Sequence, residues 1–417
     1  MAVTTIARIQ HRRGVKSDLP ETLNEGELGW CLDTRELFIG NSPAVGGNTQ
    51  ILTTASNLAA IAQYTFVSDT SVASVTGSSA AQPVVRSLQN QIDDYWVNVK
   101  AYGAAGDGIT DDTAAINRAI SDLYTKILTT AESALQTQKA IWFPSGTYRI
   151  TSAVKVYPGV RLVGEHSSAV NVHLDNNVVA QPCVLRLVDS LGQEDTAIGN
   201  NGADLPVNIF VEQITFSTSN DETILLLQRC EDITFDSCVF RGNWAVGDGA
   251  TTAQKAVNIQ TLGSSVTTQN IQFNNCVFED VVYAIYCNDP ARSISCDRSL
   301  FRDCYRSVFI GDVPYLNGPF FCTISNSVFR DIDDRAIYVQ SINPGVSSIN
   351  NVFDNVGELP GSVVQCIFWD VGTTLCTSVN DRFSRLGNPP ATARIFNANP
   401  SSNMILNAQD SFNQPVP

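Results

Sequence analysis

The apolar and polar positions in the second half of this chain follow a repeating pattern. The unit ITFDSCVFRG begins at residue 233 and returns in five related copies, which begin at residues 271, 294, 322, 346 and 376. One phenylalanine keeps its place in every copy, with intervals of 38, 23, 28, 24 and 30 residues between Phe240, Phe278, Phe301, Phe329, Phe353 and Phe383. A unit of this length cannot bury its own apolar side. The pattern therefore predicts a solenoid whose stacked coils share one core, lined by these rings.

Two further recurrences belong to this pattern. The segment Glu212–Phe216 reads EQITF and returns 19 residues later as EDITF at Glu231–Phe235, which we interpret as part of the same repeat. Cys238 and Cys276 occupy one position of the unit. Because a free cysteine behaves as a small apolar residue, we expect a buried stack of thiols at that position.

The start of the solenoid has its own pattern. Apolar and polar residues alternate from residue 97 to 101, which predicts a strand, and a glycine-rich loop follows. Asp111 or Asp112 then precedes an apolar stripe at Ile116, Ile120, Leu123 and Ile127, with the spacing of one helix face. We therefore expect a capping helix near residues 111–128, with the aspartates at its N-cap.

The rest of the chain divides into three further zones. Residues 1–52 read as a small N-terminal β domain, in which residues 29–40 form two short strands around a polar turn. Residues 53–96 read as a linker that ends in a short helical neck, because an apolar seam is formed by Val85, Leu88, Ile92 and Tyr95. The neck either packs on the next domain or is the place where three chains meet. The solenoid takes residues 97–394, and residues 395–417 form a C-terminal tail.

The composition limits which partners and cofactors are expected. The net charge of −15 disfavours nucleic acid and anionic lipid as partners, and 16% charged residues suit a β structure better than a helical bundle. Three histidines and the absence of a CxxC pair leave little for a metal site, so neither a metal nor a cofactor is expected. The eleven cysteines are expected to be free and mostly buried. Neither a secretory leader nor a membrane span is expected from the sequence.

The N-terminal zone resembles a module of bacteriophage tail fibre and tropism-determinant proteins. The form of that module is R-I-Q-x-R-R-G, then G-E-x-G, then D-T-x-x-L-x-I-G. The matching residues here are Arg8, Ile9, Gln10, Arg12, Arg13, Gly14, Gly26, Glu27, Gly29, Asp33, Thr34, Leu37, Ile39 and Gly40. The resemblance implies that residues 1–52 attach the protein to other phage tail proteins in the virion.

The start of the solenoid resembles the pectate-lyase-like, right-handed parallel β-helix family. The shared residues are Tyr102, Gly103, Ala104, Gly106, Asp107, Gly108, Asp111, Asp112, Thr113, Ala115 and Ile116, continued by Phe143, Pro144, Gly146, Tyr148, Gly159, Val160, Leu162 and Gly164. In that family the helix caps the solenoid, so Asp107, Asp111 and Asp112 are interpreted as loop and cap residues. The resemblance makes the chain mainly β, with a right-handed single-stranded parallel β-helix.

Together the two resemblances imply a bacteriophage tail spike or fibre protein. It would be synthesised in the host cytoplasm, assembled into the virion as a homotrimer, and present its β-helix to a host surface polysaccharide, without nucleic acid and without membrane insertion. The alternative is a depolymerase, a glycoside hydrolase or lyase that acts on host capsule or lipopolysaccharide. Whether the protein is an enzyme stays open at this point.

Candidate site residues follow from the repeat. Asp280, Asp303 and Asp331 fall at one position, so neighbouring carboxyls are expected about 5 Å apart, the spacing of a retaining glycosidase pair. Asp303 and Asp331 are the catalytic candidates. The carbohydrate-contact candidates are Asp280, Arg302, Arg330, Asp333, Asp334 and Trp244.

Two other interpretations of these residues remain. Arg241, Arg302, Arg330 and Arg385 adjoin the aspartates, so an Arg and Asp ladder that only neutralises itself is an alternative to sugar binding and to catalysis. Aromatic side chains that could stack on sugar rings are Trp244, Tyr283, Tyr305, Tyr315, Tyr338 and Trp369.

Overall fold

The computed structural model separates the chain into two compact units, Met1–Tyr95 and Trp96–Pro417. The residues it describes are 11–41, 47–51, 63–64, 86–87, 96–128, 140–175, 183–189, 192, 206–219, 221–245, 248, 254–260, 268–288, 291–311, 321–340, 345–357, 365–370, 373–386, 394–398, 400–406 and 409–410. Within these residues, no helix combines the length and the apolarity that crossing a membrane requires.

The first unit contains the small N-terminal β sheet that the sequence predicts. Its four strands follow the order β1 (His11–Gly14), β2 (Leu28–Cys31), β3 (Leu37–Gly40) and β4 (Asn48–Ile51). Strands β2 and β3 pair antiparallel around the polar turn, while β1 and β2 pair parallel. A short 3-10 helix, η1 (Lys16–Asp18), follows β1, and Leu23 and Cys31 are buried under the sheet.

The predicted helical neck stays a prediction, because almost all of it lies outside the described residues. The structure describes Arg86 and Ser87, which form the short strand β6 (Arg86–Ser87) and pair antiparallel with β5 (Gln63–Tyr64). The seam residues Val85, Leu88, Ile92 and Tyr95 themselves lie outside the described residues.

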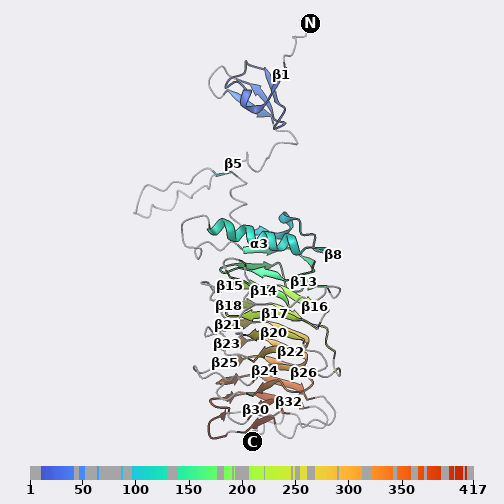
Figure 1. Ribbon diagram of the computed structural model, residues 1–417, viewed down its shortest axis with the longest axis vertical. Helices are drawn as coiled ribbons and strands as arrows, with labels where there is room; N and C mark the ends of the chain where they lie inside the picture. Colours follow the sequence, from blue (N-terminus) through green and yellow to red (C-terminus); the bar gives the residue numbers. More distant parts are fainter. Residues whose placement is uncertain are drawn as a thin grey trace, which may run out of the picture. The chain divides into compact units, whose positions relative to one another are not determined.

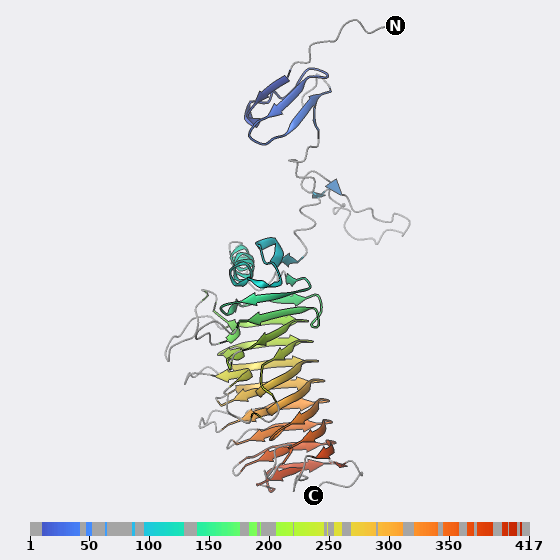
Figure 2. The same ribbon diagram turned by 90° about the vertical axis from the view of Figure 1, so that its right-hand side faces the viewer.

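The second unit is a parallel β-helix, which confirms the predicted fold (Figures 1 and 2). All of its strand pairs are parallel, and each strand pairs with the equivalent strand of the next coil. The strands form three faces. The first face consists of β7 (Val97–Asn98), β9 (Ala140–Phe143), β12 (Arg161–Gly164), β15 (Val207–Glu212), β18 (Glu231–Asp236), β21 (Thr268–Asn274), β23 (Ala291–Asp297), β25 (Cys322–Ser325), β28 (Val346–Ile349), β31 (Thr377–Val379) and β34 (Met404–Leu406).

Two long strands join the second and third faces. β22 (Val277–Cys287) and β24 (Leu300–Ile310) each begin on the second face and end on the third. The other second-face strands are β8 (Asp107–Asp111), β10 (Gly146–Ile150), β13 (Val170–Leu174), β16 (Thr215–Thr218), β19 (Val239–Arg241), β26 (Val328–Ile332), β29 (Val352–Val356), β32 (Arg382–Leu386) and β35 (Gln409–Asp410). The other third-face strands are β11 (Val154–Val156), β14 (Cys183–Leu187), β17 (Thr223–Gln228), β20 (Lys255–Gln260), β27 (Ile337–Val339), β30 (Ile367–Trp369) and β33 (Ile395–Asn397).

Helix α3 (Thr113–Leu128) lies across the first coil (Figure 1), close to η2 (Val99–Tyr102). Its apolar stripe is buried at Ile116, Ile120 and Leu123, and the side chain of Ile127 lies outside the described residues. Asp111 accepts a hydrogen bond from the Thr113 amide at 3.1 Å.

The other two aspartates of this segment order the loop before the helix. Asp112 is 1% exposed, and its carboxylate accepts the amides of Ala105 and Gly106 at 2.7 and 3.0 Å. Asp107 accepts the amides of Ile109 and Thr110, both at 2.8 Å. These aspartates therefore serve as cap and loop residues.

The predicted phenylalanine ladder lines the core. Consecutive rings from Phe240 to Phe383 stack with centroids 4.6–5.1 Å apart and interplanar angles of 3–12°. Phe216 adds an earlier rung, since it pairs in register with Phe240. The rings stack with nearly parallel planes because the parallel register places equivalent side chains one coil apart.

One part of the repeat was misread from the sequence. Glu212–Phe216 is not equivalent to Glu231–Phe235, because Glu212 pairs with Asp236 and Phe216 pairs with Phe240. The true interval is therefore 24 residues and not 19. The Ile-x-Phe pattern occurs on two different faces, since Ile214 and Phe216 are buried at the second face and Ile233 and Phe235 at the first.

A chain of buried polar groups runs beside the phenylalanines at the turn from the first to the second face. The amides of Cys276, Ser299, Ser327 and Asn351 donate to the side chains of Ser299, Ser327, Asn351 and Asp381, one coil further on, at 2.8–3.2 Å. The predicted thiol stack is the start of this chain. All eleven cysteines are free and buried.

Asp381, the last of these buried polar groups, provides a test of how burial affects stability. Burial raises the pKa of the Asp381 carboxyl. The folded state therefore favours the neutral form, and stability falls as pH rises from the unfolded pKa near 4 through the folded pKa. Asp381→Asn removes this loss and keeps an acceptor for the Asn351 amide. We expect D381N to be more stable than wild type at pH 7 by about 1 kcal/mol, and equal to it near pH 3, by calorimetric thermal midpoints.

Asp297 supplies a control of opposite sign. Hydrogen bonds from Asn326 and Ser325, both 2.8 Å long, lower the pKa of its carboxyl. D297N should therefore lower the midpoint at pH 7 and leave it unchanged at about pH 2, where the carboxyl is protonated in both states. A D381N midpoint below that of wild type at pH 7 would contradict the burial argument.

Candidate functional site

The three predicted aspartates form a column at the bend between the second and third faces. Asp280, Asp303 and Asp331 each have a left-handed backbone, with φ of 55°, 51° and 54°. Short Asp side chains tolerate this conformation, which turns the chain from one face to the next. The flanking residues pair in register, so neighbouring carboxyls lie one coil apart, about 4.8 Å.

Two of the three carboxyls are harder to ionise than usual. Burial raises the pKa of Asp280, and the charges of Glu279 and Asp303 add to this effect. Burial likewise raises the pKa of Asp303, with a further contribution from Asp331. Asn355 follows Asp331 in the column, and its amide nitrogen donates to Asp331 Oδ1 at 2.8 Å. The column therefore places two carboxyls with raised pKa values on adjacent coils.

The arginines pair with carboxylates that lie outside the aspartate column. Glu279 is 2% exposed and forms ion pairs with both Arg241 and Arg302, which lie one coil before and one coil after it. Arg330 pairs with Asp354 at 3.6 Å. The self-neutralising ladder thus exists on the second face, but it uses Glu279 and Asp354 in place of Asp303 and Asp331.

The reason for this choice of partner is directional. Glu279 and Asp354 share the strand position of the arginines, while the left-handed residue that follows turns away from it. Ser384, and not Arg385, continues this arginine column, because Ser384 pairs with Asp354. Arg302 and Arg330 keep side chains that are 46% and 52% exposed.

A second cluster lies next to the column, on the third face. Asp334 is buried and forms ion pairs with Arg306 and Arg335. The Arg306 guanidinium lies 5.2 Å from the Tyr305 ring centroid and 5.1 Å from that of Tyr338. Arg335 lies 4.8 Å from the Tyr338 ring centroid. We call these five residues the arginine–tyrosine cluster.

The predicted aromatic contacts are less available than the sequence suggests. Trp244 is 4% exposed and meets Tyr305 edge-on at 6.4 Å, so it buttresses the cluster and has little ring surface for a ligand. Trp369 is 1% exposed, and Tyr315 lies outside the described residues. Both guanidiniums lie over Tyr338, which limits the ring face left for a sugar. Asp333 is also buried, so it positions the turn before Asp334.

Sequence reasoning missed an outward aromatic column on the third face. Consecutive rings lie 4.7–5.3 Å apart along Tyr286, Phe309, Tyr338, Phe368 and Phe396. The signal was present, because the first four are the aromatic residues of the apolar runs AIYC, SVFI, AIYV and VVQCIF. Its recognition required knowing that these residues point outward.

The histidines do not form a catalytic pair. His166 hydrogen-bonds to Ser168, and His173 hydrogen-bonds to Ser217 at 2.8 Å on the second face. Burial lowers the pKa of His173. Among the described residues, no group of three or more histidine, cysteine, aspartate or glutamate side chains is arranged to hold a metal ion.

Comparison with known families gives two matches. The model described as rhamnogalacturonase A/epimerase, pectate lyase-like, matches residues 96–309. The model described as the major tropism determinant N-terminal domain matches residues 9–41. The two sequence resemblances are thus confirmed.

Individual relatives are more distant. The pre-neck appendage protein of Bacillus phage phi29 is 22% identical over 272 residues, which cover 54% of this chain and 29% of that protein. The non-secreted LysM effector LysM15 of Penicillium expansum is 44% identical over 69 residues, 16% of this chain and 5% of that protein. The chain therefore spans less than a third of these relatives. The solved structure of Geobacillus virus E2 ORF18 aligns over 97% of this chain and 75% of its own, with 15% identity and a TM-score of 0.49.

The arginine–tyrosine cluster predicts a stability effect. Asp334→Asn leaves Arg306 and Arg335 close together without their shared carboxylate, which should cost about 3 kcal/mol in the free energy of unfolding. Asp331→Asn is the matched control. Asn suits the left-handed backbone and retains the oxygen that accepts from Asn355, so its cost should stay within about 0.5 kcal/mol. Urea unfolding followed by circular dichroism measures both, and equal costs would show that the cluster does not hold the third face.

Proposed function

The chain belongs to the rhamnogalacturonase A/epimerase, pectate lyase-like family, and we propose that it is a bacteriophage tail spike or fibre protein that binds a host surface polysaccharide. One observation carries this proposal. A tropism-determinant N-terminal domain at residues 9–41 and a β-helix at residues 96–309 occur in one chain. The first part would attach the protein to the virion, and the second would meet the cell surface.

The phage comparison and the charge support this role. The relative from phage phi29 is a pre-neck appendage protein, and its similarity extends over 54% of the chain. The net charge of −15 disfavours nucleic acid and anionic membranes as partners. The proposed partners are other phage tail proteins, bound through residues 1–52, and a host glycan. The protein would be synthesised in the host cytoplasm and reside in the virion.

The proposed glycan contacts lie around the aspartate column. Arg302 and Arg330 are half-exposed and offer guanidinium donors to sugar hydroxyls. Asp280 lies beside them and offers an acceptor. Asp333, Asp334 and Trp244 are buried, so they would support the site by holding the bend between the faces.

A homotrimer is part of the proposal. It rests on the apolar seam at residues 85–95 and on the resemblance to tail spikes. We expect multi-angle light scattering of the purified protein to give about three times the 45.1 kDa chain mass. A chain that starts at residue 96 should lose this mass if the neck assembles the trimer. A monomeric full-length protein would contradict the assembly.

Glycan binding is tested on a panel of purified bacterial capsules and lipopolysaccharides. A binder should retain at least one of them without releasing reducing ends. Arg302→Ala combined with Arg330→Ala should weaken that binding about tenfold, a loss of about 1.4 kcal/mol. Arg298→Ala is the control, because Arg298 is an exposed arginine on the turn between the first and second faces. An equal effect of both changes would remove Arg302 and Arg330 from the site.

A depolymerase is the second candidate function. The observation that favours it is the pair of raised carboxyl pKa values, Asp280 and Asp303, on adjacent coils. A retaining glycosidase uses two carboxyls about 5–5.5 Å apart, one protonated and one ionised. In this mechanism Asp303 would be the acid, and Asp280 or Asp331 the nucleophile.

The same panel distinguishes the two functions. If reducing ends or unsaturated oligosaccharides appear, Asp303→Asn should reduce their release by about 10³-fold or more, as loss of a catalytic carboxyl requires. Asp331→Asn should do the same only if Asp331 is the nucleophile. Release that persists unchanged in both variants would place the chemistry elsewhere on the molecule.

A further inference from the structure

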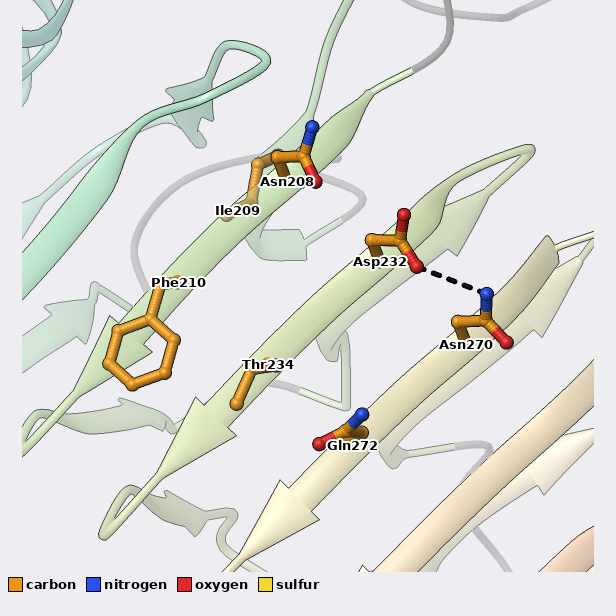
Figure 3. A pocket seen from close by; sticks show the side chains of 7 residues that line it. All are labelled: Asn208, Ile209, Phe210, Asp232, Thr234, Asn270 and Gln272. Atoms are coloured by element: carbon orange, nitrogen blue, oxygen red, sulfur yellow. Dashed lines mark hydrogen bonds between the residues drawn. The ribbon is translucent and has the colours of Figure 1, made fainter. Parts of the chain in front are cut away.

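The first face carries a shallow pocket of about 460 Å³ that crosses β15, β18 and β21 (Figure 3). Asn208, Asp232 and Asn270 form one of its rows, each with a left-handed backbone and φ of 55–57°. Phe210, Thr234 and Gln272 form the second row, in register with one another. We call these two rows the amide groove. It belongs to a different face from the aspartate column and the arginine–tyrosine cluster.

In the amide groove, fewer side chains are hydrogen-bonded to a neighbouring coil than in the other polar columns. On the second face, Glu279 pairs with both neighbouring arginines, and at the turns Asn275 and Asn326 donate to aspartates of the preceding coil. In the groove, the bond from Asn270 to Asp232, 3.0 Å long, is the contact between rungs. Among the described residues, the side chains of Asn208, Thr234 and Gln272 make no hydrogen bond to the protein.

Unused polar groups in register are suited to a ligand with a matching repeat. The rungs lie about 4.8 Å apart, close to the length of one pyranose residue in a linear glycan. Two amides and a hydroxyl offer both donors and acceptors, as sugar hydroxyls require. A glycan that runs along the solenoid axis would therefore meet at least one polar side chain at each of the three coils.

The charge of the groove selects against an acidic ligand. Its lining contains one carboxylate, Asp232, and no cation. On this face the guanidinium of Arg161 lies 5.2 Å from the Phe210 ring centroid, and it is paired with Glu212. The Asp232 carboxylate would repel an anionic sugar, whereas an uncharged sugar meets no such repulsion.

We propose that the amide groove is a second glycan site, specific for an uncharged polysaccharide that lies across β15, β18 and β21. This inference rests on the proposed function and extends it, because it assigns a substrate class and a separate face. The two sites can be tested independently, since no residue is shared between them.

The experiment uses the full chain and four defined probes. Maltohexaose, cellohexaose and laminarihexaose are the neutral probes, and hexagalacturonate is the acidic comparator, with binding followed by saturation-transfer NMR. We expect at least one neutral hexaose to bind and hexagalacturonate to bind the groove at least fivefold more weakly. Thr234→Val combined with Gln272→Leu should weaken neutral binding at least fivefold. Both changes suit an outward strand position, so the fold should persist.

Thr147→Val is the matched control. Thr147 is an exposed residue of β10 on the second face and lies outside the groove, so binding should be unchanged. The inference is overturned if no neutral hexaose shows binding that the double variant weakens, or if hexagalacturonate binds the groove as well as they do. It is also overturned if the double variant lowers the light-scattering mass without changing sugar binding, since the face would then join two copies.

The Arg302→Ala and Arg330→Ala variant separates this inference from the proposed function. Sugar binding that is lost in the arginine variant and retained in the groove variant would refute the groove and leave the proposed function standing. Failure of every glycan in the panel and of every hexaose would count against both. Binding that the groove variant alone abolishes would support the inference directly.

Discussion

The structure depends on one constraint, the parallel pairing of each strand with its equivalent one coil later. This pairing sets the main neighbours of every side chain at a fixed spacing of about 4.8 Å. Equivalent residues on neighbouring coils must then pack on one another, hydrogen-bond to one another, or remain available to a ligand. The rings from Phe240 to Phe383 pack on one another, since each stacks on the ring of the next coil inside the core.

The buried polar chain shows hydrogen bonding between neighbouring coils. Four buried backbone amides each donate to a side chain one coil further on, those of Cys276, Ser299, Ser327 and Asn351. None of these four donors is therefore left unpaired. The same logic explains the second face, where Glu279 serves two arginines at once. Both arrangements stabilise the stack and leave those groups little capacity for a ligand.

The places with spare capacity are the functional candidates. At the bend, Asp280 and Asp303 lie on adjacent coils, and their pKa values rise because burial disfavours the charged form and neighbouring carboxylates add to this effect. In the amide groove, the side chains of Asn208, Thr234 and Gln272 make no hydrogen bond to the protein, and Thr234 and Gln272 are in register. A ligand-binding site on this solenoid is therefore expected at a column whose polar side chains do not pair with one another.

The sequence by itself determined the coil, its aromatic core, the capping helix and the in-register aspartates, because these depend on spacing within one repeat. It misassigned Glu212–Phe216, since two faces of one coil bury the same Ile-x-Phe pattern. The partners of Arg302 and Arg330, the burial of Trp244 and the existence of the amide groove were decided only by the tertiary structure. The physical reason is that these contacts join residues far apart in the sequence, 23–38 positions for the arginines and the groove and 61 for Trp244 and Tyr305. Loops of unequal length separate those residues, so only the stacked backbone sets which side chains meet.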